Sequence, residues 1–127
     1  MTIEEALRAV AAMYNTCSTE RIEPLLAQDF HYASQWVFSE HESKNDFLDY
    51  MRVKLKTVAA SGQPVFAELA TTGPQYGSQP CLVLAQDGRE RLVATILVEV
   101  SDGMISRIDV CAVPPPEATT RLGVYPR

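Results

Sequence analysis

The sequence of 127 residues has few cysteines and histidines, the side chains that form disulfides and bind transition metals. Its three cysteines, Cys17, Cys81 and Cys111, are an odd number, lie far apart and show no CxxC or cysteine–histidine ligand spacing. Its only two histidines, His31 and His41, lack the HxxxH spacing of a zinc-binding helix. We therefore expect reduced, buried thiols, no metal and no other cofactor.

Long apolar runs and clusters of positive charge are also missing. No apolar stretch approaches the ~20 residues that a membrane-spanning helix needs. The N-terminus carries Glu4 and Glu5, where a signal peptide would be basic. The formal net charge is −5, and the arginines and lysines are scattered, which disfavours nucleic acid as a partner. We expect a cytoplasmic protein that binds neither membranes nor nucleic acid.

The composition is that of one ordinary globular domain. Hydrophobic residues make up 46% and charged residues 21% of the chain, and no segment is repetitive or polar enough to predict disorder. A chain of this length buries a single core. We expect one domain over residues 1–127, in which residues 114–127 form an extended tail that a partner subunit could hold in place.

Three segments have helical periodicity. Thr2 and Glu5 form a capping-box pattern, and the apolar residues that follow predict a first helix over residues 2–15. A short second helix is expected over residues 18–28, and a third, with an apolar stripe, over residues 43–62.

The remaining segments alternate in the manner of strands. The expected strands are Phe30–Phe38, Val65–Thr71, Pro80–Ala85, Arg91–Val100 and Met104–Val113. Asp87-Gly88 and Asp102-Gly103 are typical of hairpin turns, so neighbouring strands should be antiparallel. The sequence predicts an α+β fold in which helices pack on a strongly curved, largely antiparallel sheet, in the order α-α-β-α-β-β-β-β.

This order, together with residues 15–38 (NTCSTERIEPLLAQDFHYASQWVF) and the closing hairpin 98–113 (VEVSDGMISRIDVCAV), resembles the nuclear-transport-factor-2-like superfamily. That superfamily includes SnoaL-like polyketide cyclases, ketosteroid isomerases and scytalone dehydratases. The resemblance implies a cystatin-like cone, in which a bent sheet wraps a long helix and the open end holds a mostly apolar ligand cavity. It also implies a homodimer through the outer face of the sheet.

The same resemblance argues against ketosteroid isomerisation. By register, the phenolic proton donor, the catalytic carboxylate and the second carboxyl donor of the isomerases fall near Val10, Ser34 and Leu97. None of these residues can donate or accept a proton in the required way.

Candidate ligand-binding residues follow from the face that the resemblance assigns to the cavity. They are Tyr14, Tyr32, Ser34, Trp36, Ile108 and Val110. Tyr32, Ser34 and Trp36 share one face of the first strand by alternation, and Tyr14 lies one helical turn after Val10. Simple core packing explains the same pattern of aromatic residues.

Candidate catalytic residues are His31, Tyr14 and Glu99. His31 should point away from the Tyr32 side unless a bulge reverses it. Glu99, like Glu68, is a carboxylate in an apolar strand, where burial could raise its pKa, although exposure at an edge or on the outer face is the alternative.

The last strand shows the same alternation. Ile105, Arg107 and Asp109 alternate with Ile108 and Val110, so we expect the first set on the outer face, with Arg107 and Asp109 as an ion pair.

Two functions of different class remain open. The chain is either a small-molecule-binding cone protein, of lyase or isomerase type on a small apolar or aromatic substrate, or a non-catalytic dimerising module with a residual cavity. The sequence identifies neither a reaction nor a substrate.

Overall fold

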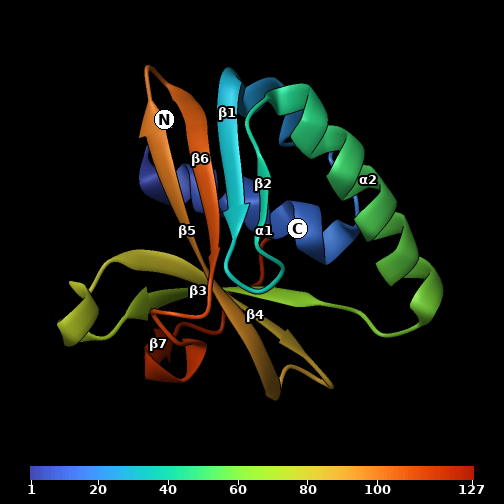
Figure 1. The fold of residues 1–127 in the computed structure, drawn as a ribbon. Coiled ribbons are helices and arrows are strands. Elements are labelled where there is room, and N and C mark those ends of the chain that lie inside the picture. Colours follow the sequence, from blue (N-terminus) through green and yellow to red (C-terminus); the bar gives the residue numbers. More distant parts are fainter.

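Two α-helices lie against one curved sheet of seven strands in the computed structural model of the chain (Figure 1). The structure describes the backbone of all 127 residues and every side chain except that of Ser39. Helix α1 is Ile3–Thr16 and helix α2 is Lys44–Ser61. The strands are β1 (Leu26–Ser34), β2 (Ser39–His41), β3 (Phe66–Thr72), β4 (Pro80–Gln86), β5 (Arg91–Ser101), β6 (Met104–Cys111) and β7 (Thr119–Arg121). The predicted α+β class is confirmed.

The strand order is β2-β1-β6-β5-β4-β3-β7. Strands β1 and β6 are parallel, and every other neighbouring pair is antiparallel, so the sheet is mixed but largely antiparallel, as the sequence predicts. Figure 1 shows α1 crossing behind the strands and α2 running along one side of the sheet. The main hydrophobic core fills the space between these helices and the sheet.

Helix α1 begins with the predicted capping box. Thr2 Oγ1 accepts a hydrogen bond from the Glu5 amide at 3.1 Å, and Glu5 Oε1 accepts one from the Thr2 amide at 3.1 Å. The helix ends at Cys17, whose left-handed φ of 53° closes the last turn. Its apolar side, including Leu7 and Tyr14, is buried, which fixes the direction in which Tyr14 points.

Helix α2 also matches its prediction. Ser43 Oγ accepts a hydrogen bond from the Asp46 amide at 3.1 Å, and Gly62, with a φ of 71°, supplies the left-handed residue after the last turn. Phe47 and Met51 are fully buried against the sheet. Neither α2 nor any other helix that the structure describes is long and apolar enough to cross a membrane.

The predicted second helix is wrong in extent. Only one turn of 3₁₀ helix, η1 (Glu23–Leu25), forms between α1 and the sheet, and Leu26 already begins β1. Pro24 has no amide hydrogen to continue a helical ladder. Leu26 instead aligns with Ile105 of β6, so pairing in the sheet outweighs the local helical pattern.

The first strand ends earlier than predicted, and Trp36 is therefore not part of it. Residues 35–38 form a turn that leads back into β2, where His41 aligns with Tyr32. Phe38 has a left-handed φ of 48°, and the side chain of Trp36 is 55% exposed. The prediction that Trp36 shares a buried strand face with Tyr32 is wrong, because the hairpin ends the alternation after Ser34.

A bulge changes the alternation in β6. The β5–β6 register shifts between Glu99 and Val100, opposite Ser106. Ile105 is therefore fully buried in the main core, contrary to the predicted outer-face position. Arg107 and Asp109 lie on the opposite face of the sheet, as predicted, and are bonded to each other.

The C-terminal tail, residues 114–127, packs on the chain's own sheet. Pro114 and Pro116 are buried, the short helix η3 (Pro116–Ala118) contacts β5, and β7 pairs with β3. The tail is thus held by contacts within the chain itself.

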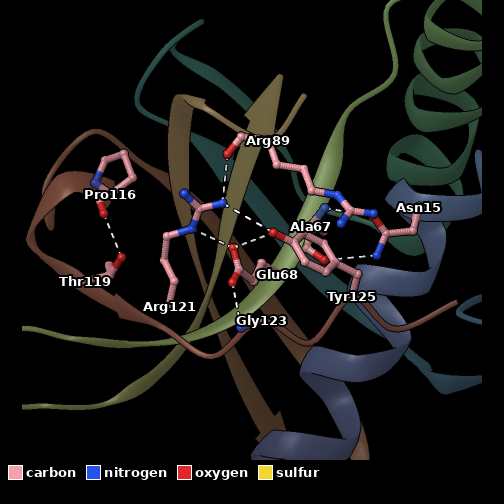
Figure 2. Close-up of polar contacts among 9 residues, drawn as sticks. All are labelled: Asn15, Ala67, Glu68, Arg89, Pro116, Thr119, Arg121, Gly123 and Tyr125. Atoms are coloured by element: carbon pink, nitrogen blue, oxygen red, sulfur yellow. Dashed lines mark hydrogen bonds and ion pairs between the residues drawn. The ribbon is translucent and has the colours of Figure 1, made fainter. Parts of the chain in front are cut away.

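A buried carboxylate holds this tail (Figure 2). Glu68 Oε1 accepts hydrogen bonds from Arg121 Nε at 2.6 Å and from Tyr125 Oη at 3.0 Å, and Oε2 accepts one from the Gly123 amide at 2.7 Å. The Glu68 side chain is only 4% exposed. The alternative that Glu68 is exposed at an edge or on the outer face is therefore wrong, since the tail covers it.

The side chain of Asn15 joins the end of α1 to the same region. Its Nδ2 donates to the Ala67 carbonyl at 2.9 Å, and its Oδ1 accepts from the Ala67 amide at 2.8 Å (Figure 2). The same Nδ2 also donates to the Pro126 carbonyl at 2.6 Å. Helix α1, strand β3 and the end of the chain are thereby connected by one side chain.

Candidate functional site

A cavity of about 170 Å³ lies where both helices meet the sheet. We call it the inter-helix pocket. Its walls are Tyr14 from α1; Lys54, Leu55 and Val58 from α2; Val65 from the segment before β3; Leu84 and Gln86 from β4; and Val93 from β5. Most of these side chains are aliphatic, so the interior favours an apolar occupant.

Tyr14 brings a hydroxyl into this apolar wall. Its side chain is buried, and its Oη makes no hydrogen bond to any other residue that the structure describes. Burial raises the pKa of Tyr14 far above its usual range, and the nearby Tyr50 adds to the effect. Tyr14 therefore keeps its proton, so its hydroxyl is available to donate a hydrogen bond and is not a base.

Lys54 is the only charged residue that lines the inter-helix pocket. Its Nζ donates to Tyr50 Oη at 3.4 Å and lies 5.6 Å from the centre of the Tyr50 ring. The helical i, i+4 spacing of Tyr50 and Lys54 produces this contact. The ring therefore helps to keep the ammonium group beside the pocket.

An aromatic cluster fills the core next to the pocket. The ring of Tyr32 lies 5.1 Å from that of Phe47 and 5.7 Å from that of Tyr50, centre to centre. Tyr32 is fully buried, and its Oη has no hydrogen-bond partner among the described residues. Burial raises the pKa of Tyr32, and the neighbouring Tyr14 and Tyr50 add to the rise. Tyr32 thus packs in the core and does not line the pocket.

The other predicted ligand-binding residues are divided between the core and a second cavity. Ile108 is fully buried in the main core. Ser34 and Val110 line a cavity of about 360 Å³ that we call the outer cleft. The remaining walls of the outer cleft are Ala33, Gln35, Phe38, Glu40, Arg107 and Asp109. The structure therefore does not gather the six predicted residues into one site.

The outer cleft contains an ion pair that is already satisfied. Arg107 Nε and Nη2 donate to the two carboxylate oxygens of Asp109 at 2.8 and 2.9 Å. The two hydrogen bonds that Asp109 accepts raise the pKa of the Arg107 guanidinium. This two-bond geometry leaves little of the Asp109 charge for a ligand.

His31 and Glu99 belong to the outer side of the sheet. Both align with Arg107, His31 across the β1–β6 pair and Glu99 across the β5–β6 pair. His31 Nε2 is 3.9 Å from Glu40 Oε2, and Glu99 is exposed. The three predicted catalytic residues are thus not together, since Tyr14 lies on α1 in the inter-helix pocket.

Sequence reasoning missed Lys54 and the aliphatic wall of the pocket. In the sequence, Lys54 belongs to a charged, solvated face of α2, and it is exposed in the structure. The available signal is the spacing of Tyr50 and Lys54. The described residues contain no group of three or more His, Cys, Asp or Glu side chains that could hold a metal ion.

Comparison with known proteins identifies the fold. No protein-family model and no curated protein matches the sequence. Several solved structures are similar in shape, and three of them are described here. A nuclear-transport-factor-2-like protein from Cytophaga hutchinsonii is 13% identical with a TM-score of 0.61, over 87% of this chain and 89% of that chain.

The second is a cystatin-fold protein from Novosphingobium aromaticivorans, 14% identical with a TM-score of 0.56, over 87% of this chain and 98% of that chain. The third, from Catenulispora acidiphila, has a ketosteroid isomerase-like fold and was solved with trimethylamine. It is 13% identical with a TM-score of 0.53, over 87% of this chain and 86% of that chain. Because identities this low establish the fold alone, the conclusion concerns architecture: the chain has the cone-like α+β fold of these nuclear-transport-factor-2-like and cystatin-fold structures.

Proposed function

We propose that this protein binds a small, flat, mostly apolar molecule in the inter-helix pocket. The observation that carries the proposal is the combination of an aliphatic cavity of about 170 Å³ with the unpaired hydroxyl of Tyr14 in its wall. An engineered apolar cavity of about 150 Å³ binds benzene, so this volume suits one ring. The Tyr14 hydroxyl then selects a ring substituent that accepts a hydrogen bond.

The similar protein from Catenulispora acidiphila supports the proposal in general terms, since it was solved with the small organic molecule trimethylamine. What this chain can do with a bound molecule depends on the acidic and basic side chains of its own pocket. The described walls of the inter-helix pocket contain no carboxylate and no histidine. Binding is therefore the function proposed, and in a lyase or isomerase reaction on the bound molecule Tyr14 would serve as hydrogen-bond donor.

Calorimetric titration with phenol and toluene tests the proposal. Val58→Phe places a larger side chain in the pocket from the half-buried side of α2 and should abolish binding of both compounds. Val53→Phe makes the same change at a position of α2 that is 68% exposed, and should leave binding intact. The proposal fails if the unaltered chain binds neither compound at millimolar concentration, or if Val58→Phe binds as well as Val53→Phe.

A second candidate function is homodimerisation without catalysis. The observation that favours it is an apolar tip on the β1–β2 hairpin, where Trp36, Val37 and Phe38 are 55%, 56% and 90% exposed. Gln35 Oε1 accepts hydrogen bonds from the Ala112 and Val113 amides at 2.7 and 3.0 Å, which places the 60% exposed Val113 in the same surface. Exposed apolar surface of this kind is typical of interfaces.

Sedimentation at micromolar concentration tests this second candidate. The unaltered chain should be a dimer, and Phe38→Ser should make it a monomer. Val53→Ser is the control, because it removes an exposed valine from α2, far along the chain from the hairpin. A monomer of the unaltered chain would exclude dimerisation through the tip.

A further inference from the structure

Lys54 carries the only charge at the inter-helix pocket, and that charge has no carboxylate partner. None of the ion pairs among the described residues includes Lys54. Its neighbour on α2, Arg52, lies instead between Glu23 and Asp49. The ammonium group donates a hydrogen bond to the Tyr50 hydroxyl and lies near the Tyr50 ring, and neither interaction neutralises its charge.

Gln86 adds a second donor beside Lys54. Its Oε1 accepts a hydrogen bond from Arg91 Nη2, so its amide group presents Nε2 as the remaining polar atom. Arg91 in turn donates to Asp87 at 3.0 Å, which neutralises its charge. Together with Tyr14, the pocket therefore presents three donors of different kinds and, in its described walls, no charged acceptor.

We infer that the ligand of this pocket is a single-ring carboxylic acid, bound as its anion with the carboxylate at Lys54 and Gln86 and the ring against Val58, Val65 and Leu84. The inference rests on the proposed function, and adds the charge and the orientation of the ligand. A carboxylate has two oxygens that accept hydrogen bonds, which matches the ammonium and amide donors. The volume of about 170 Å³ accommodates the ring, while the carboxylate meets the exposed Lys54 side chain.

The selectivity of the pocket for an anion has to come from the side chains that line it, because the protein as a whole is negatively charged. The formal net charge of −5 repels anions from the surface in general. A preference for an anion over a neutral molecule of the same shape must therefore come from the few groups that touch it. Since Lys54 is exposed, the preference should also decrease as salt is added.

Titration with three ring compounds of similar shape tests the inference: benzoate (anionic), benzamide (neutral) and benzylamine (cationic). At low ionic strength we expect benzoate to bind about tenfold more tightly than benzamide, as for one charge-assisted contact, and benzylamine to bind least tightly. Lys54→Met keeps the apolar stem and removes the charge. It should reduce benzoate affinity about tenfold and benzamide affinity much less, because only benzoate loses an interaction between opposite charges.

Lys56→Met is the matched control, because it removes an exposed lysine of the same helix that does not line the inter-helix pocket. It should keep the preference for benzoate. Equal affinities for benzoate and benzamide, with no effect of Lys54→Met, would overturn the inference while leaving the proposed pocket intact. If none of the three compounds binds, and phenol and toluene do not bind either, the inference and the proposed function both fail.

Discussion

The region around Glu68 and the inter-helix pocket around Tyr14 both contain tyrosine hydroxyls and charged side chains, but they differ in pairing. Glu68 receives hydrogen bonds from Arg121, Gly123 and Tyr125, and Arg121 also donates to the Arg89 carbonyl at 2.8 Å. The Arg89 guanidinium lies 4.1 Å from the centre of the Tyr125 ring. Every polar group at the centre of this region has a partner within the chain.

The inter-helix pocket has the opposite property. Tyr14 has no hydrogen-bond partner among the described residues, and Lys54 has no counter-ion there. The described side-chain atoms that are fully buried without a partner are His31 Nε2, Tyr32 Oη and Thr95 Oγ1. Tyr14 Oη is not one of them, so this hydroxyl is unpaired but open to the pocket. The Glu68 interactions therefore hold the tail to the sheet, whereas the unpaired groups of the inter-helix pocket are the basis of our proposal that it binds a molecule from outside the chain.

The largest expected effect on stability is that of Glu68→Ala. Removing the carboxylate leaves Arg121 without its partner and releases the C-terminal tail from the sheet. Loss of one member of a buried ion pair lowers the free energy of unfolding by about 3 to 5 kcal/mol. Because Arg121 is partly exposed, we expect a loss near the lower end, about 3 kcal/mol. Urea denaturation measures the loss, and faster cleavage by trypsin at Arg121 reports the released tail.

Glu99→Ala is the control for that measurement. Glu99 is also a carboxylate within a strand, but it is exposed. Its removal should change the free energy of unfolding by less than about 0.5 kcal/mol. Equal effects of the two substitutions would mean that the Glu68 interactions contribute little to stability.

A smaller effect is expected from Tyr125→Phe. The substitution removes the hydroxyl, which donates to Glu68 Oε1 and accepts from Arg121 Nη2 at 3.3 Å, and keeps the ring beside Phe66 and Arg89. A typical hydrogen bond contributes about 0.5 to 1.5 kcal/mol, so the free energy of unfolding should fall by about 1 kcal/mol. Denaturation curves that superimpose on those of the unaltered chain would contradict this assignment.

The smallest effect on stability is expected from Tyr14→Phe, which makes the same chemical change in the inter-helix pocket. Because the Tyr14 hydroxyl has no partner within the described chain, its removal should leave the free energy of unfolding unchanged within about 0.5 kcal/mol. Phenol binding should weaken about fivefold, as for one lost hydrogen bond, while toluene binding stays constant. A loss of stability as large as that of Tyr125→Phe would show that Tyr14 is paired within the fold.

Much of the fold could be predicted from local patterns, because those patterns act over a few residues. The capping box at Thr2 and the stop at Gly62 set the ends of the two helices correctly. The errors arise where the structure is determined by pairing between segments that are far apart in the sequence. Leu26 enters the sheet by pairing with β6, and the hairpin after Ser34 removes Trp36 from the strand, although neither is visible in the local alternation.

The candidate site was less predictable, because it depends on which elements meet. Tyr14 could be proposed from its place on α1, and it does line a pocket. Lys54 could not be proposed, because it occupies an ordinary position on an exposed helix face. Nothing in the sequence indicates that the cavity beside it has no other charged residue in its wall. The burial of Glu68 could not be predicted either. It depends on the tail, which returns to β3 from the far end of the sequence.

Chemical-shift mapping of the amide groups during titration with benzoate tests the central claim most directly, because it locates the bound molecule without any substitution. The account predicts shifts concentrated at Tyr14, Lys54, Val58 and Leu84, around the inter-helix pocket. Shifts concentrated instead at Ser34, Glu40 and Arg107, around the outer cleft, or no saturable shifts at all, would contradict it.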